Sequence, residues 1–255
     1  MTTTDRSVTV IMPAFNAEKT IAASIESVLK QTHRDFELII LDDCSTDRTA
    51  ELARAYEKQD ARVRFLINET NIGVSLTRNR GVELAKHDWV AFLDSDDTWT
   101  EDKLEKQLKT ADAHPECAIF FTSTAYVFET GKRSHYVLHA PEKVYRKDVL
   151  RQNVISCSSS LVRRDALLKH PMKNDRMIHE DMAAWVAILA ETPYAVGIDE
   201  PLLIYRISKS GKSGNKLKAA KMQWRTYRAA GIGFFTALSC YLVYAWRGVR
   251  KYSAI

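Results

Sequence analysis

The sequence predicts an α/β protein with a Rossmann-like, mostly parallel sheet, followed by a smaller antiparallel part and a helical C-terminal tail. Over the first 115 residues, short β-forming runs alternate with helical patterns, which is typical of a parallel sheet. After Cys117 the pattern becomes mixed, and residues 229–246 carry no charged side chain. We therefore expect one domain at residues 1–215, with halves at 1–115 and 116–215, and a basic and apolar tail at 216–255.

The individual elements follow from apolar runs and helical spacing. Apolar runs predict strands at residues 8–12, 36–41, 63–67 and 89–93, and helical patterns predict helices at 20–31, 47–60, 75–85 and 101–113. In the second half, residues 118–128 and 136–138 around a Thr130-Gly131 turn predict antiparallel strands, and residues 155–162 predict another. A later helix is expected to open at His179-Glu180-Asp181 and to carry Trp185.

Composition and charge narrow the class of protein. A chain of 255 residues with 45% hydrophobic content can form a single domain with a sizeable core. The net charge of +5 comes from the tail, which carries eight basic residues and no acidic ones from Lys216 onward. Because these charges flank an apolar segment and do not form a patch on the domain, nucleic-acid binding is not expected. The four cysteines lie far apart without a C-x-x-C pair, so they predict neither a zinc site nor a disulfide framework.

An acidic loop, Asp94-Ser95-Asp96-Asp97, directly follows the apolar run that ends at Leu93. In an α/β sheet, ligands bind at the carboxyl ends of the strands. Hard divalent cations are held there by one or two carboxylates together with phosphate oxygens. The loop therefore predicts a site for a metal ion that carries a diphosphate. The alternative is helix capping, in which Thr98 and Glu101 form an S/T-x-x-E box and the aspartates favour the helix dipole.

Several other motifs accompany the acidic loop in a fixed order. They are Pro13-Ala14-Phe15-Asn16, Asp42-Asp43, Asn71-Ile72-Gly73, Arg78-Asn79 and, downstream, Glu180-Asp181. In this order and spacing they resemble the inverting family-2 glycosyltransferases of the GT-A fold, of the bacterial polysaccharide type, over residues 7–210. The resemblance implies a metal-dependent enzyme, using Mn²⁺ or Mg²⁺, that moves a hexose or N-acetylhexosamine from a UDP-sugar to a glycan acceptor, and we expect this acceptor to be lipid-linked. The first half would then bind the nucleotide sugar, and the second half the acceptor.

The resemblance also implies the site residues. It assigns the nucleotide sugar to Pro13, Phe15, Asp43, Arg78, Asp96, Glu180 and Arg206, and the metal ion to Asp97 together with Asp96. A carboxylate such as Asp43 can accept a hydrogen bond from the N3–H of uracil. Phe15 can stack on the base, with core packing as its alternative. Arg78 can contact phosphate or the donor sugar, with a surface salt bridge as its alternative.

Two positions depart from the pattern of the family. Many relatives carry Tyr where this chain has Phe15, and the common form carries Gly where this chain has Cys44. If Cys44 has a positive φ, it costs more there than Gly would. The backbone geometry of this loop therefore depends on the φ angle of Cys44.

The resemblance places the catalytic base at Asp181. In an inverting transfer, the acceptor hydroxyl attacks C1 of the sugar opposite the nucleotide, and one carboxylate takes its proton. The alternative for Asp181 is a helix N-terminus that is simply enriched in acids. Tyr205-Arg206, followed by residues 208–213, resembles a late Tyr-Arg element and a mobile lid.

The tail leaves three alternatives open. As a helix, residues 229–246 would span about 27 Å, just short of a bilayer, and their aromatic side chains suit a membrane interface. The segment can be an interfacial amphipathic anchor, a transmembrane helix, or a soluble helix or homo-oligomer contact. Because the N-terminus has no secretory signal, we expect a cytoplasmic protein that is peripheral at the inner face of the cell membrane.

Two alternative functions stay open beside transfer to a glycan. One is a polyprenyl-phosphate glycosyltransferase. The other is a non-catalytic protein that binds nucleotide sugars or acts as a scaffold. Turnover of a UDP-sugar separates an enzyme from a binding protein.

Overall fold

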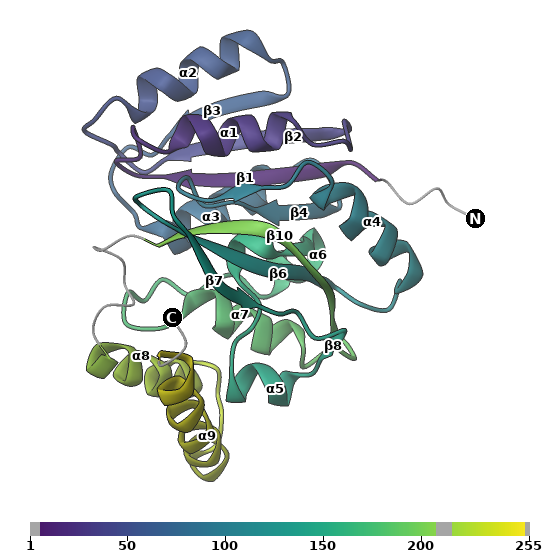
Figure 1. Cartoon of the computed structure of the whole chain (residues 1–255), viewed down its shortest axis with the longest axis vertical. Coiled ribbons are helices and arrows are strands. Elements are labelled where there is room, and N and C mark those ends of the chain that lie inside the picture. Colours follow the sequence, from purple (N-terminus) through teal and green to yellow (C-terminus); the bar gives the residue numbers. More distant parts are fainter. Residues whose placement is uncertain (1–5, 208–215, 253–255) are drawn as a thin grey trace.

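A mixed sheet forms the centre of the molecule in the computed structural model. The structure describes residues 6–207 and 216–252, and within the second segment it describes the side chains of residues 220–244. The strand order is β3-β2-β1-β4-β9-β6-β10-β5, and β7 and β8 pair at the sides. Alternate residues of the strands face two separate hydrophobic clusters. One cluster lies under α1, α2 and α4, and the other under α3 and α5–α9, so helices cover both faces of the sheet (Figure 1).

The first half forms the parallel part of the sheet. β1 (Val8–Ala14) lies between β2 (Phe36–Asp42) and β4 (Trp89–Phe92), and β3 (Val63–Ile67) pairs with β2 at the edge. All residues of β1 and β2 are buried, which explains why most of their side chains are apolar. The helices are α1 (Ile21–Leu29), α2 (Thr49–Gln59), α3 (Val74–Leu84) and α4 (Lys103–Ala113). The sequence prediction is confirmed for all eight elements within two residues at each end.

The capping alternative for the acidic loop is wrong. Thr98 lies in the short strand β5 (Thr98–Trp99), which pairs antiparallel with β10 (Ala195–Ile207). α4 begins only at Lys103, and its N-cap residue Asp102 makes no side-chain capping bond. The chain that leaves the acidic loop is thus extended and bonded to a neighbouring strand, so no helix starts there for Thr98 to cap.

The second half is mixed, and the sequence prediction for it is only partly right. The hairpin of β6 (Ile119–Phe128) and β7 (Arg133–Leu138) is confirmed, with Gly131 at φ 82° in its turn. The strand expected at residues 155–162 is wrong in its first part, where the chain forms the 3₁₀ turn η1 (Cys157–Ser159) and only β9 (Leu161–Arg163) is extended. The hydroxyls of Ser159 and Ser160 donate to backbone carbonyls three residues back, and such local bonds compete with sheet pairing.

The remaining elements of this half are one short strand and three helices, and the helices share the hydrophobic cluster of α3. They are β8 (Lys143–Val144), α5 (Arg146–Arg151), α6 (Arg164–Lys169) and α7 (Glu180–Ile188). The start of α7 agrees with the expected helix at Glu180. The strand β10 runs parallel to β6 and antiparallel to β5 and β8, so it connects the second half to the acidic loop of the first.

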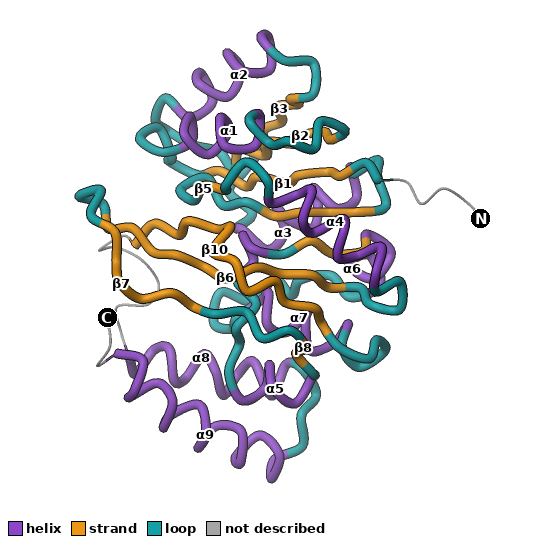
Figure 2. Tube along the Cα trace, turned by 45° about the vertical axis from the view of Figure 1, so that its right-hand side comes forward, coloured by secondary structure: helices purple, strands orange, loops and turns teal. Residues whose placement is uncertain are grey.

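The tail forms two helices, α8 (Lys216–Ala229) and α9 (Phe234–Tyr252), which lie at one end of the molecule beside α5 and α7 (Figure 2). Tyr227, Ile232, Ala237 and Cys240 are buried in the same hydrophobic cluster as α5 and α7, and the Tyr227 hydroxyl donates to the Leu150 carbonyl at 2.6 Å. Among the described residues, no helix has the length and apolar character needed to cross a membrane. The lid expected at residues 208–213 lies outside the described part of the chain.

Candidate functional site

The site lies where the parallel strands β1, β2 and β4 end at the same edge of the sheet. The loops that follow these strands carry Phe15, Asp43 and the acidic loop. Backbone bonds hold the strand ends together: Asp43 N–H donates to the Ala14 carbonyl at 2.8 Å, and Leu93 N–H donates to the Ile11 carbonyl at 3.1 Å. Residues from three sequence regions therefore converge at the position where α/β sheets bind ligands.

Asp43 organises the loop of residues 68–73. Its Oδ1 accepts hydrogen bonds from Asn68 Nδ2 (2.8 Å) and Ile72 N–H (2.9 Å), and its Oδ2 accepts one from Gly73 N–H (2.8 Å). The carboxylate is buried. Because each carboxylate oxygen can accept two bonds, Oδ2 keeps the capacity for one more donor. A base N3–H is a donor of that kind.

Phe15 and Cys44 lie in two loops that bond to each other. Phe15 is 51% exposed, so the alternative of core packing is wrong, whereas Pro13 is buried in β1 opposite Leu41. Cys44 has φ 67°, the left-handed conformation that favours glycine. Asn16, at φ 49°, accepts from Thr46 N–H at 2.9 Å and fixes the two loops against each other. The loop thus keeps this conformation with a cysteine where the family pattern has glycine.

Asp97 is a buried carboxylate with an unused acceptor. Its Oδ1 accepts from the backbone N–H of Arg206 at 3.0 Å, while its Oδ2 is buried without a hydrogen-bond partner among the described residues. Burial and the neighbouring carboxylates of Asp94 and Asp96 raise the pKa of Asp97 well above its usual range. Burial and Asp94 also raise the pKa of Asp96. Three close carboxylates with a free, buried oxygen have the chemistry that a hard cation satisfies.

A cation at this loop needs ligands from outside the protein. Within the described ranges, no group of three or more His, Cys, Asp or Glu side chains is arranged to hold a metal ion on its own. Mg²⁺ and Mn²⁺ are commonly bound by one or two carboxylates, with phosphate oxygens and waters as the other ligands. The residues present therefore fit an ion that arrives with a diphosphate, with Asp97 and Asp96 as its protein ligands.

Arg78 connects the acidic loop to helix α7. Its Nη2 donates to Asp94 Oδ1 at 2.6 Å, and its Nη1 donates to Glu180 Oε1 at 3.3 Å. The guanidinium is buried, so the alternative of a surface salt bridge is wrong. Its Nε is also buried without a partner among the described residues. Arg78 thus holds two predicted site regions together, and its contact with phosphate stays a prediction.

Asp181 lies in the first turn of α7, next to Glu180. Burial and the charge of Glu180 raise its pKa, against the opposing effects of His179, the Met182 N–H and Arg78. Among the described residues its Oδ1 accepts only from the Met182 N–H, at 2.7 Å. Glu180, by contrast, is paired with Arg78. The two neighbouring carboxylates therefore have different environments, and a raised pKa is what a general base near neutral pH requires.

Two further residues support the site, and the sequence reasoning missed both. The Thr226 hydroxyl of α8 accepts from His179 N–H at 2.9 Å, at the start of α7. The Ser158 hydroxyl accepts from Asp94 N–H at 3.1 Å, and the Ser158 carbonyl accepts from Trp99 Nε1 at 2.7 Å. The run of serines at 158–160 was a signal for side-chain bonding, whereas nothing in the sequence links Thr226 to His179.

The fold is that of the GT-A glycosyltransferases. Two solved structures share the fold. The crystal structure of S. aureus TarS 1-349 in complex with UDP-GlcNAc aligns with a TM-score of 0.72 and 20% identity, covering 88% of this chain and 65% of that chain. The mannosyltransferase PcManGT from Pyrobaculum calidifontis, in complex with GDP-Man and Mn²⁺, aligns with a TM-score of 0.71 and 16% identity, covering 94% of this chain and 70% of that chain.

The chain belongs to glycosyl transferase family 2, whose profile matches residues 9–170. It is 38% identical, over 96% of each chain, to the putative teichuronic acid biosynthesis glycosyltransferase TuaG of Bacillus subtilis. It is also 34% identical to the UDP-Glc:alpha-D-GlcNAc-diphosphoundecaprenol beta-1,3-glucosyltransferase WfgD of Escherichia coli, over 86% of this chain and 85% of the relative. The family and fold that the motifs predicted are thereby confirmed.

Proposed function

We propose that the protein transfers a hexose or N-acetylhexosamine from a UDP-sugar to a lipid-linked glycan, with inversion, in the synthesis of a cell-surface polysaccharide. The observation that carries this proposal is the buried Asp97 with its unpartnered oxygen, set beside two further carboxylates at the strand ends. The names of the relatives support it, since they describe teichuronic acid synthesis and a UDP-glucose donor. The enzyme would act peripherally at the inner face of the cell membrane.

Donor binding would use both sides of the strand ends. Asp43 Oδ2 would accept the N3–H of uracil, and the exposed ring of Phe15 would stack on the base above the turn that Pro13 begins. A divalent ion at Asp97 and Asp96, when bound, would neutralise charge on the departing diphosphate. The side chain of Arg206, whose Nε donates to the Asp96 carbonyl at 3.3 Å, would hold this loop in place.

Asp181 is the proposed base, and its neighbours explain why. The acceptor hydroxyl gives its proton to the carboxylate as its oxygen attacks C1 from the side opposite the diphosphate, which leaves with the pair of electrons of the broken bond. Glu180 is engaged by Arg78 and is less available for that proton. Arg78 would orient both the acidic loop and α7, because its guanidinium donates to Asp94 and to Glu180.

The acceptor proposal favours a saccharide on a lipid diphosphate over polyprenyl phosphate. The relative WfgD is named for a GlcNAc-diphosphoundecaprenol acceptor. The TarS structures hold UDP-GlcNAc and UDP, which bear on the donor and not on the acceptor. The polyprenyl-phosphate alternative and the non-catalytic alternative are outcomes of the test below.

The test is a panel of donors and acceptors. UDP-glucose, UDP-galactose, the corresponding UDP-N-acetylhexosamines and GDP-mannose are incubated with the protein and Mn²⁺ or Mg²⁺. The acceptor is either a GlcNAc-diphospho-lipid or a polyprenyl phosphate, and release of the nucleoside diphosphate is measured. We expect metal-dependent release of UDP, stimulated by the saccharide-bearing lipid. Stimulation by polyprenyl phosphate alone would support the first alternative. Binding of UDP-sugars with no turnover of any of them would support a non-catalytic protein.

A further inference from the structure

Helix α9 is apolar on two opposite faces, and packing in the described structure uses only one of them. Ala237 and Cys240 are buried against the core. On the outer side, Phe235 is 84%, Leu238 39% and Leu242 63% exposed. These three residues follow the i, i+3, i+7 spacing of a single helix face. Large exposed side chains aligned in this way mark a surface that binds a partner.

A basic stripe accompanies this apolar face on the neighbouring helix. Lys221, Arg225 and Arg228 of α8 follow the i, i+4, i+7 spacing and are exposed. None of them forms an ion pair with another residue in the described part of the chain. The sequence has no acidic residue after Glu200, so no nearby charge in the tail neutralises the stripe.

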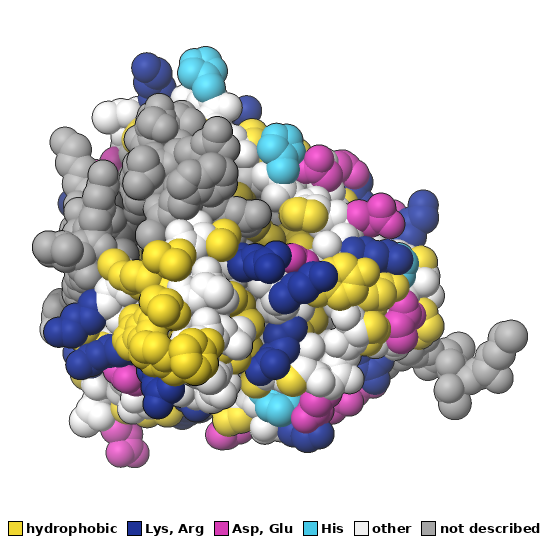
Figure 3. Space-filling view, turned by 90° about the horizontal axis from the view of Figure 1, so that it is seen from below, with side chains coloured by type: hydrophobic (Ala, Val, Ile, Leu, Met, Phe, Trp, Pro, Cys, Tyr) yellow, Lys and Arg dark blue, Asp and Glu magenta, His cyan; other side chains and the backbone are white. Residues whose placement is uncertain are grey.

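The two helices hold these groups in a fixed arrangement. Trp224 of α8 contacts Phe234 and Tyr241 of α9 edge to face, with ring centroids 5.9 and 5.8 Å apart. Tyr227 and Ile232 anchor the turn between the helices in the core. Viewed from the end of the molecule where α8 and α9 lie, a hydrophobic patch has Lys and Arg side chains along its border (Figure 3).

We propose that the outer surface of α8 and α9 docks on an anionic lipid bilayer. This surface, called here the hairpin face, consists of Phe235, Leu238 and Leu242 with Lys221, Arg225 and Arg228. This docking proposal rests on the proposed function, because the lipid-linked acceptor lies in such a bilayer. Apolar side chains that enter the interface and basic side chains that meet lipid head groups are the two requirements of a peripheral amphipathic helix. A second copy of the chain suits the surface less, because its own basic stripe would meet a like charge.

The hairpin face also relates the membrane to the site. The inner side of α8 carries Thr226, whose hydroxyl accepts from His179 N–H at the start of the helix that bears Asp181. The outer side of the same helix carries the basic stripe. A bilayer on the hairpin face is therefore separated from the start of α7 by the thickness of one helix, which suits an acceptor that emerges from the lipid surface.

The experiment is co-sedimentation of the full chain with phosphatidylcholine vesicles, with and without phosphatidylglycerol. One variant replaces the apolar residues (Phe235→Ser with Leu242→Ser), and another replaces the basic residues (Lys221→Gln, Arg225→Gln and Arg228→Gln). The matched controls are Leu168→Ser, an exposed leucine on α6, and Lys58→Gln on α2, at the opposite end of the molecule (Figure 1). Thermal melting of each variant shows that it is folded.

We expect the wild type and both controls to sediment with anionic vesicles. The basic variant should bind these vesicles on the order of 100-fold more weakly at low salt, because each basic residue near the surface contributes a factor of about five. The apolar variant should lose the binding that survives at high salt, since screening weakens the charge attraction but not the insertion of side chains.

Two outcomes overturn the proposal. The first is a wild type that stays in the supernatant with anionic vesicles at low salt. The second is a wild type that is dimeric and becomes monomeric in the apolar variant, which assigns the face to a second copy. UDP release with a water-soluble saccharide acceptor is measured in parallel. Turnover without vesicle binding refutes only the docking surface, and vesicle binding without turnover refutes only the proposed enzyme.

Discussion

Asp97 shows how one buried carboxylate links metal binding to stability. Its pKa is raised by burial and by Asp94 and Asp96, so the folded protein retains a proton that the unfolded chain has released at the same pH. The metal-free protein is therefore expected to lose stability as the pH rises from the pKa of an unfolded aspartate towards this raised value. A bound cation reverses the effect, because it favours the ionised form.

The first prediction concerns Asp97→Asn. Without metal at neutral pH, the variant should melt a few degrees higher than the wild type, since 1 kcal/mol corresponds to roughly 2–4 °C for a chain of this size. Mn²⁺ with UDP should raise the melting temperature of the wild type but not of the variant. Differential scanning fluorimetry measures both, with the less buried Asp96→Asn as the comparison. A variant that melts lower in the metal-free state and still responds to Mn²⁺ with UDP would contradict the assignment.

The second prediction concerns Asp181→Asn, which keeps the size of the side chain but cannot take the acceptor proton. We expect kcat to fall by about 10²–10⁴-fold with UDP affinity within a few fold of the wild type. In the wild type, kcat should decline as the pH falls through the raised pKa of Asp181, above the range of an ordinary aspartate. Glu180→Gln is the control. If it abolishes that pH dependence and Asp181→Asn does not, the base is Glu180.

The third prediction concerns the contact between the helices α8 and α7. Thr226→Val removes the acceptor of the His179 N–H at the start of α7, and an unsatisfied buried group costs about 1–3 kcal/mol. We expect a loss of kcat larger than the loss of UDP affinity, because Asp181 lies two residues after His179. Thr226→Ser keeps the hydroxyl and should retain the activity. Equal kinetics of the Val and Ser variants would show that α8 does not position the base.

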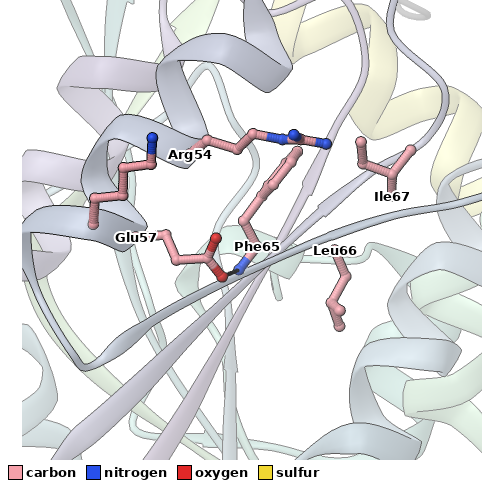
Figure 4. Close-up of a pocket in the computed structure, with 6 residues that line it drawn as sticks. Arg54, Glu57, Phe65, Leu66 and Ile67 are labelled. Carbon is pink, nitrogen blue, oxygen red and sulfur yellow. Dashed lines mark hydrogen bonds between the residues drawn. The ribbon is translucent and has the colours of Figure 1, made fainter.

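The fourth prediction concerns the edge of the sheet at β3. The Phe65 N–H, on the outer edge, donates to the Glu57 carboxylate at 2.8 Å. The Arg54 guanidinium lies 5.6 Å from the Phe65 ring centroid. These residues and Ile67 line a pocket on the surface between α2 and β3 (Figure 4). Covering an edge in this way prevents pairing with other chains. Glu57→Ala should therefore increase aggregation on mild heating, measured by light scattering. Glu51→Ala on the same helix should not.

The elements also show how far the sequence determines the fold. β1 to β4 are predictable because most of their residues are apolar, and β1, β2 and β4 are buried along their whole length. β10 was missed because Gly197, Asp199, Glu200 and Pro201 interrupt it as a turn would. The structure accommodates them with irregular pairing to β6 between Ile198 and Leu203, and such bulges leave little trace in an apolar pattern.

The candidate site, too, can be predicted from the sequence only in part. Residues in the loops after parallel strands, such as Asp43 and Asp97, are predictable because the ends of parallel strands meet at one edge. Whether Cys44 has a positive φ was left open by the sequence, and the structure shows φ 67° there. The pairing of Arg78 with Glu180, which is 102 residues away, depends on how α7 is placed by the second half and the tail. No local pattern contains that information.

The fifth prediction concerns the whole molecule and the place of the tail in its core. Removing residues 230–255 deletes the buried Ile232, Ala237 and Cys240, and truncating one buried isoleucine alone costs about 2–5 kcal/mol. The truncated protein should melt well below the full chain, measured by circular dichroism, in addition to losing vesicle binding. Phe235→Ser with Leu242→Ser should melt like the wild type. An unchanged melting temperature after truncation would show that the tail is independent of the core.

The continuous sheet has a mechanical consequence. β10 is bonded to β6 in the second half and to β5 beside the acidic loop, and β9 joins β4 to β6. A rotation of one half against the other would have to break these rows of backbone bonds, so the two halves lack the hinge that many two-part enzymes use to enclose their substrates. Under the proposed function, enclosure of the donor would then come from segments that extend beyond the strand ends, and the sheet would keep its shape.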